Sequence, residues 1–238
     1  MIIRRKLISL LIIAAGALSC APLAMSQAGT SVNEGDWPNI HGDAAARRYS
    51  PLDQINPDNV GDLEIAWNFS TLHFGVGTDY VNPSTPLEVD GVLYANIGST
   101  RNVVALDATN GQVLWLWRYQ EGDRFDEAPR KGAGRGVSYW SDGESARIID
   151  VSPGYQLVSL DAETGIPDPN FGDNGLVDLY VGVRNGEDDR FAYPDIGLSA
   201  PPFVMNDVIV IGAAHRTGGR PRSKFNTKGD VRGFDVHT

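Results

Sequence analysis

Arg135 is the residue of this 238-residue chain whose type and surroundings point most directly to ligand chemistry. It lies in the glycine-rich loop 132–136, which reads Gly-Ala-Gly-Arg-Gly. A guanidinium group is permanently charged and offers a planar fork of donors, which suits carboxylate and other oxygen ligands. The glycines lack the Gly-x-Gly-x-x-Gly spacing of a dinucleotide site, and no βαβ pattern surrounds them. The loop alone leaves a ligand-binding arginine and an ordinary surface arginine both open.

No other catalytic motif stands out in the sequence. It shows no Ser/His/Asp arrangement, His-Glu-x-x-His pair or phosphate loop above background. We interpret the acidic runs Asp123–Glu127 and Glu187–Asp189 as solvated loop faces, and Trp115 and Trp117 as packing residues. The formal net charge of −10 argues against binding to a nucleic-acid backbone.

Short runs of β-type residues, separated by turn signals, make up the chain after its first 26 residues. The expected strands are 63–69, 91–95, 102–106, 146–151, 156–160 and 208–211. Asp-Gly and Asn-Gly pairs between them, such as Asp90-Gly91 and Asn110-Gly111, tolerate the positive φ of tight hairpins. No window of a dozen residues keeps a helical apolar stripe, so the pattern predicts an all-β protein.

An internal repeat organises these strands. The repeat pattern occurs at residues 105–115, 159–165 and 233–238. Each copy has an Asp at the end of an expected strand, and in the first two copies a Thr and a Gly follow it. We expect the carboxylate to bind turn amides and the Gly to take a left-handed conformation. A Trp four residues later should fill the gap between neighbouring sheets, but the second copy has Pro169 there, with Phe171 nearby.

The length of the repeat favours a β-propeller. Its aspartates stand at Asp107, Asp161 and Asp235, at intervals somewhat longer than the roughly 40–50 residues of a four-stranded blade. Such intervals indicate blades with loop insertions. A propeller protects its sheet edges by radial repetition; the alternative is a β-sandwich with coincidental turns.

Residues 1–26 have the features of a signal peptide. A basic cluster, Arg4 to Lys6, precedes an apolar run at 7–18, and Ala24-Met25-Ser26 offers a cleavage site before Gln27. The predicted mature domain is therefore 27–238, exported to the periplasm. An uncleaved membrane anchor and lipidation at Cys20 are the alternatives, so membrane association stays open.

An ordered series of motifs runs through residues 35–238. It comprises Trp37-Pro38, Gly42-Asp43, 48–52 (Arg-Tyr-Ser-Pro-Leu), 54–56 (Gln-Ile-Asn), Ala66-Trp67, 85–94 (Thr-Pro-Leu-Glu-Val-Asp-Gly-Val-Leu-Tyr), 135–140 (Arg-Gly-Val-Ser-Tyr-Trp) and 171–175 (Phe-Gly-Asp-Asn-Gly). Together these motifs resemble the pyrroloquinoline-quinone (PQQ) dependent, or quinoprotein, alcohol and sugar dehydrogenases.

The resemblance implies an eight-bladed propeller around PQQ, present here as a partial propeller of roughly four blades. It implies a bound Ca²⁺ that polarises the quinone and oxidation of a sugar, polyol or alcohol, with electrons passed to ubiquinone or a cytochrome. It assigns cofactor contacts to the guanidinium of Arg135 and the hydroxyl of Ser199. His215 is a third cofactor candidate. A strand-start hydroxyl and a loop histidine without such a role are the alternatives for the last two.

Three departures from the family pattern bear on the site. No cysteine precedes Arg135, whereas the methanol and ethanol branches stack PQQ on a vicinal disulfide; this favours the sugar or polyol branch. Asn82-Pro83-Ser84 stands where the family often has Glu. Residues 213–217 carry no carboxylate where some branches supply a Ca²⁺ ligand, and Ca²⁺ prefers oxygen ligands. The metal ligands are therefore not assigned.

The third repeat copy is incomplete at Thr238, and the general base of the family normally lies further along. We therefore expect no catalytic residue in this segment and no activity of this chain alone. The alternative function is a non-catalytic PQQ-repeat propeller that serves as an envelope assembly scaffold. Such scaffolds share the repeat but lack the opening motifs and the segment 135–140, which favours the enzyme.

Overall fold

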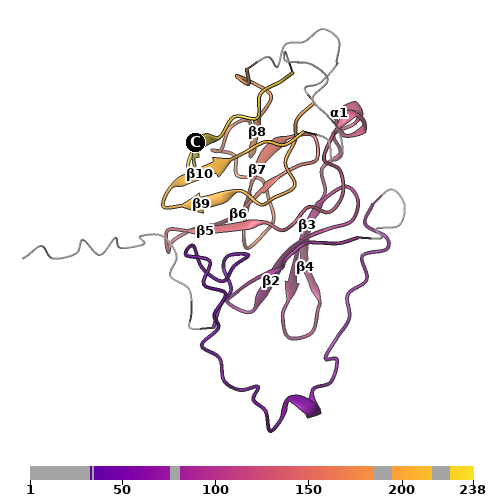
Figure 1. Cartoon of the computed structure of the whole chain (residues 1–238), viewed down its shortest axis with the longest axis vertical. Coiled ribbons are helices and arrows are strands. Elements are labelled where there is room, and N and C mark those ends of the chain that lie inside the picture. The colour runs from indigo at the N-terminus through magenta and orange to yellow at the C-terminus, as the bar shows by residue number, and fades with distance from the viewer. Residues whose placement is uncertain (1–32, 34, 76–80, 185–194, 216–225) are drawn as a thin grey trace, which may run out of the picture.

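The computed structural model describes residues 33, 35–75, 81–184, 195–215 and 226–238, and their strands form three antiparallel sheets (Figure 1). Blade 1 is β1 (Leu87–Val89), β2 (Val92–Ile97), β3 (Asn102–Asp107) and β4 (Val113–Trp117). Blade 2 is β5 (Ser138–Ser141), β6 (Ala146–Val151), β7 (Gln156–Asp161) and β8 (Leu176–Asp178). Blade 3 is β9 (Phe203–Met205), β10 (Val208–Ile211) and β11 (Arg232–Asp235). In each blade the strands pair in chain order, which confirms a partial propeller.

The described residues form three sheets rather than the roughly four blades predicted, and residues 35–75 contribute a 3-10 helix, η1 (Val60–Asp62), and no strand. The predicted strand 63–69 is therefore the one of the six that is wrong. This segment has the composition of a strand, but its backbone forms no ladder with any described strand. Its side chains Leu63 and Ile65 are exposed, and Figure 1 shows the segment looping out beyond β4.

The repeat turns form as predicted. At the end of β3, Asp107 Oδ1 accepts bonds from the amide and hydroxyl of Thr109, at 2.8 and 2.5 Å. Gly111 then takes φ = 73°. At the end of β7, the equivalent glycine, Gly165, has φ = 71° and lies under the ring of Trp115 from the preceding blade. A Cβ at Gly165 would lie 2.5 Å from that ring, so only glycine fits.

Tryptophan docking onto the next repeat turn holds neighbouring blades together. The Nε1 of Trp115 donates to the carbonyl of Ala162 at 2.9 Å, in the turn after β7. Trp67 makes the equivalent bond to Ala108 at 3.0 Å, in the turn after β3. The segment 63–69 thus presents its tryptophan as an outer strand would, although it forms no ladder among the described residues.

Two hydrophobic cores fill the spaces between the blades. The core between blades 1 and 2 contains Leu87, Val89, Tyr94, Val103, Ala105, Trp115, Val137, Ile148, Val158, Leu160 and Ala162. The core between blades 2 and 3 contains Trp140, Ile149, Val151, Tyr155, Leu157, Phe171, Leu179, Ile196, Ile209, Ile211 and Val236. Phe171 is fully buried in the second core, so it supplies the aromatic group that the degenerate second repeat lacks.

The N-terminal segment packs against the first strands of the blades. Trp37 exchanges two backbone bonds with Glu88 of β1, at 2.7 and 3.1 Å. Further along, Ile40 lies beside Gly136, the glycine that follows Arg135. A cavity of about 240 Å³ separates residues 38–46 from β5 and β9. This segment therefore lies directly beside the loop that carries Arg135.

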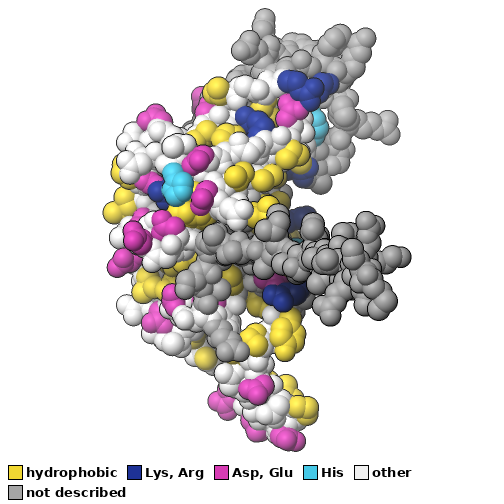
Figure 2. Space-filling view, turned by 90° about the vertical axis from the view of Figure 1, so that its left-hand side faces the viewer, with side chains coloured by type: hydrophobic (Ala, Val, Ile, Leu, Met, Phe, Trp, Pro, Cys, Tyr) yellow, Lys and Arg dark blue, Asp and Glu magenta, His cyan; other side chains and the backbone are white. Residues whose placement is uncertain are grey.

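Acidic side chains are spread over the face shown in Figure 2, with few basic ones among them, in keeping with the negative net charge. No helix in the described ranges is long and apolar enough to cross a bilayer. The predicted signal peptide, residues 1–26, lies outside those ranges, and the domain boundary at residue 27 stays a prediction.

Candidate functional site

Three corresponding positions, one at the entrance to each blade, are joined by backbone hydrogen bonds. Thr85 precedes β1, Arg135 precedes β5 and Ser199 precedes β9. The amide of Thr85 donates to the carbonyl of Arg135 at 3.1 Å, and the amide of Arg135 donates to the carbonyl of Ser199 at 2.9 Å. The structure therefore brings two of the three predicted cofactor residues into direct contact through their backbones. We call this arrangement the entrance row.

The side chain of Arg135 is exposed and forms no hydrogen bond or ion pair with any described residue. The glycines around it let the backbone approach its neighbours closely. Gly136 has φ = 131°, and a Cβ there would lie 2.8 Å from the carbonyl oxygen of Thr85. With its backbone used in the entrance row, Arg135 keeps its whole guanidinium fork available for a ligand.

Ser199 is half-buried. Its carbonyl oxygen accepts from Arg135, and its hydroxyl has no partner in the described part of the chain. A hydroxyl can both donate and accept, so it could bind an oxygen of the ligand that Arg135 holds. The guanidinium of Arg135 and the hydroxyl of Ser199 could together bind a carboxylate at this edge of blades 2 and 3.

His215 joins the entrance row less directly. Its neighbour Ala214 exchanges two backbone bonds with Gly197, at 2.9 and 2.7 Å, two residues before Ser199. The imidazole Nδ1 lies 3.0 Å from the carbonyl oxygen of Asp195. A carbonyl only accepts, so Nδ1 carries the proton and Nε2 is the nitrogen left for another partner.

The described residues contain no group of three or more His, Cys, Asp or Glu side chains that could hold a metal ion. The residues at the entrance row therefore fit an anionic organic cofactor, since they offer a cationic fork and a hydroxyl. They do not supply a Ca²⁺ site, and no metal ligand is assigned to them.

A buried charged network lies behind the entrance row and was not predicted from the sequence. Arg101, at the end of the β2–β3 turn, is 2% exposed. Asp150, near the end of β6, is also buried and accepts a bond from Asn96 Nδ2 at 2.8 Å. Burial raises the pKa of Asp150 to about 6, although the charge of Arg101 acts to lower it. The one sequence signal was Asp150 itself, because a carboxylate in an apolar strand needs a partner.

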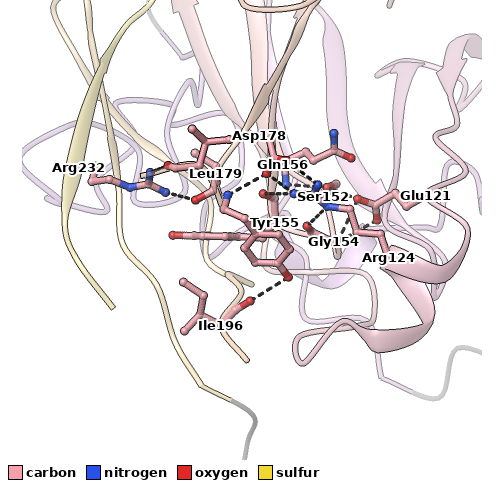
Figure 3. Close-up of polar contacts among 12 residues, drawn as sticks. Glu121, Arg124, Ser152, Gly154, Tyr155, Gln156, Asp178, Leu179, Ile196 and Arg232 are labelled. Carbon is pink, nitrogen blue, oxygen red and sulfur yellow. Dashed lines mark hydrogen bonds and ion pairs between the residues drawn. The ribbon is translucent and has the colours of Figure 1, made fainter. Parts of the chain in front are cut away.

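The acidic run Asp123–Glu127 is a short helix, α1, rather than the loop predicted from its composition. Arg124 within it is half-buried and donates to the carbonyl of Gly154 at 2.6 Å and to Asp178 at 2.5 and 2.9 Å (Figure 3). Glu121, just before α1, accepts from the hydroxyl of Ser152 at 2.6 Å. These bonds fix the helix against blade 2, which explains why a locally polar sequence is ordered there.

Comparison with known proteins identifies the class to which this fold and site belong. A family model described as "PQQ: Glucose/ethanol/alcohol dehydrogenase, beta-propeller domain" matches residues 37–238. The chain belongs to this family, as the motifs of residues 35–238 predicted.

Individual relatives agree with this family. The chain is 29% identical over 231 residues to the glycerol dehydrogenase large subunit of Gluconobacter thailandicus, covering 92% of this chain and 30% of that protein. It is 34% identical over 237 residues to the dehydrogenase subunit of the quinone alcohol dehydrogenase of Gluconobacter oxydans, covering 94% and 28%. A solved quinohemoprotein alcohol dehydrogenase from Pseudomonas putida is similar, with a TM-score of 0.62 at 27% identity, over 86% of this chain and 25% of that one. The chain thus spans less than a third of the length of these relatives.

Proposed function

We propose that the full-length protein is a PQQ-dependent dehydrogenase that oxidises the hydroxyl group of a polyol, sugar or alcohol. The observation that carries this proposal is the unpaired guanidinium of Arg135, bonded through its backbone to Ser199, in a chain of the PQQ dehydrogenase family. Oxidation of a CH–OH group to a carbonyl removes two electrons and two protons, and bound PQQ supplies the two-electron acceptor.

The residues of this chain act on the cofactor rather than on the substrate. Arg135 binds and orients an anionic edge of PQQ with its planar fork, and the hydroxyl of Ser199 adds a hydrogen bond beside it. His215 is the third candidate contact, with Nδ1 bonded to Asp195 and Nε2 left for another partner. We assign no general base to the described residues; that the catalytic acid–base group lies elsewhere in the full-length protein stays a prediction.

The substrate class is narrowed by what precedes Arg135. Residues 128–134 read Ala-Pro-Arg-Lys-Gly-Ala-Gly and contain no cysteine pair. We therefore place the protein with polyol or sugar oxidation rather than with the branches that stack PQQ on a vicinal disulfide. One relative named above is a glycerol dehydrogenase, which supports a polyol.

The proposal also includes Ca²⁺ as the ion beside the quinone, ubiquinone or a cytochrome as electron acceptor, and the periplasm as location. The basis for export is the basic and apolar pattern of residues 1–18.

Reconstitution tests the proposal. Full-length protein, freed of cofactor, would be incubated with PQQ and Ca²⁺, and reduction of an artificial dye followed with glycerol, glucose and ethanol in turn. We expect PQQ-dependent reduction, fastest with the polyol or sugar. PQQ binding without reduction by any donor would favour the scaffold alternative, and absence of PQQ binding would refute the cofactor assignment.

A further inference from the structure

Arg101 makes four hydrogen bonds to main-chain carbonyls drawn from three separate segments. Its Nε and Nη2 donate to Gly132 and Arg130 at 3.2 and 2.7 Å, both in the loop before β5. Its Nη1 donates to Val151 at the end of β6, at 2.7 Å, and to Leu198 at 2.6 Å. Arg130 and Gly132 precede Arg135 in its loop, and Leu198 is the residue before Ser199. Arg101 therefore binds both segments that carry the cofactor candidates, without touching either candidate.

The loop of Arg135 lies close against the side chain of Arg101. A Cβ built at Gly134 would come within 2.9 Å of Arg101 Nε, so the absence of a side chain there permits the contact. The same turn holds the loop a second time, because the amide of Gly132 donates to the carbonyl of Ser99 at 3.2 Å. The β2–β3 turn thus binds three consecutive peptide groups of the loop, through the carbonyl of Arg130 and the amide and carbonyl of Gly132.

The burial and the backbone conformation of Arg101 are both energetically unfavourable, which indicates that this residue has a specific structural role. Removing a guanidinium from water is unfavourable by several kcal/mol unless its donors are satisfied. Arg101 also adopts φ = 55°, in the left-handed region that non-glycine residues rarely occupy. No carboxylate of the described residues bonds to it directly; Asp150 and Glu121 lie near enough for their charges to stabilise it. A buried cation directed at carbonyls alone serves to fix backbone geometry.

We propose that Arg101 is the positioning residue of the cofactor site: it sets the relative placement of Arg135 and Ser199 by clamping their two segments to blade 1. This inference rests on the proposed function for the identity of the ligand. The clamp depends on the fork of the guanidinium, since a lysine ammonium is a single point charge and cannot reach four carbonyls in three directions.

The test uses the full-length protein with two variants, Arg101→Lys and, as matched control, Arg124→Lys. Arg124 also donates to main-chain carbonyls, those of Gly154 and Tyr155, but contacts neither segment of the entrance row. Two readouts are compared: the Kd for PQQ, and amide hydrogen exchange of residues 130–137 and 197–200 in the PQQ-free protein. The amides of Thr85 and Arg135 report the entrance row directly.

We expect Arg101→Lys to raise the Kd for PQQ at least tenfold and to speed exchange in these two segments, while β7 keeps its protection. Arg124→Lys should leave both readouts unchanged. Unchanged exchange at 130–137 and 197–200 in Arg101→Lys would overturn the inference. So would faster exchange throughout, including β7, because it would show a general structural role. The exchange readout needs no PQQ, so failure of wild type to bind PQQ would refute the proposed function and leave the clamp independently tested.

Discussion

Arg135 and Arg101 use the same side chain in opposite ways. Arg135 is exposed with its donors unused, whereas Arg101 is buried with its donors directed at four carbonyls. The first arrangement suits a ligand that arrives from outside, and the second suits a fixed scaffold. Fewer than ten residues of loop separate Arg135 from the first carbonyl that Arg101 binds. The function of one arginine therefore depends on the geometry imposed by the other.

Replacing Arg135 tests the first of these roles. We expect Arg135→Gln to weaken PQQ binding by about 1.5–3 kcal/mol, or roughly 10- to 150-fold in Kd, because charge-assisted bonds to the cofactor are lost. Thermal stability should be unchanged, since no described residue bonds to the side chain. Arg118→Gln, at another exposed arginine, is the control and should leave the Kd as in wild type. Equal Kd values for both variants would contradict the assignment.

Asp150 should give the stability of the protein a distinctive pH dependence. Burial raises its pKa to about 6, so the folded state holds a proton that the unfolded chain, with a pKa near 3.8, releases. The corresponding stability is present below about pH 4 and is lost as the pH rises through 6, by up to about 3 kcal/mol. The charged neighbours that set this balance are Arg101 and Glu121.

Melting curves of wild type and Asp150→Asn between pH 4 and 7 would measure this effect as a difference between the two proteins. Wild type should lose stability relative to the variant as the pH rises. Asp178→Asn provides the opposite sign, because hydrogen bonds from Arg124 lower the pKa of Asp178. There, wild type should gain stability relative to the variant as the pH rises toward about 4, the pKa of the unfolded carboxyl, and the difference should be nearly flat from pH 4 to 7, so this pair is also measured below pH 4. A flat difference for Asp150→Asn would mean that Asp150 is ionised at all these pH values.

Among the elements, the repeat turn is the part that local sequence determines most completely. The Asp, Thr and Gly of each turn interact within five residues, so their bonds and the left-handed glycines could be predicted. The strand 63–69 could not be judged in the same way, because a strand requires a neighbour that local composition does not reveal. Arg101 was missed for a related reason: its bond to Leu198 joins residues 97 positions apart.

The fit of tryptophan on glycine in the repeat turn can be tested by a pair of substitutions. Gly165→Ala and Gly91→Ala both place a Cβ at positive φ, 71° and 76°. Only the first also meets an obstacle, the ring of Trp115, whereas nothing lies within 4 Å at Gly91. We expect Gly165→Ala to destabilise the protein by about 1–3 kcal/mol more than Gly91→Ala, measured by denaturant or thermal unfolding. Equal losses of stability in the two variants would show that Trp115 can move away from a Cβ at residue 165 without an energetic cost.

For the molecule as a whole, stability depends on joints between blades as well as on the blades themselves. Arg147 of β6 is an example. It forms an ion pair of 2.5 Å with Asp168 in blade 2, and its Nη1 donates to the carbonyl of Val236, the residue after β11. Both charged side chains are largely buried, at 14% and 10% exposure. The ion pair itself lies within blade 2, and it holds Arg147 where its second bond, to Val236, reaches blade 3.

Arg147→Met should destabilise the protein by about 3 kcal/mol, because it leaves the Asp168 carboxylate buried without its partner. The double variant with Asp168→Asn should recover a large part of this loss, which a double-mutant cycle on unfolding free energies would measure. If the two single losses simply add, the ion pair between Arg147 and Asp168 contributes nothing to stability.

The entrance row has a consequence for how such a site can change over time. Thr85, Arg135 and Ser199 are connected by peptide groups alone, so the frame is indifferent to which side chain each position carries. The backbone of the entrance row is a common frame for three exchangeable side chains, here a hydroxyl, a cation and a second hydroxyl. A new ligand preference could therefore arise by substitution at one of the three positions, without any change in the backbone.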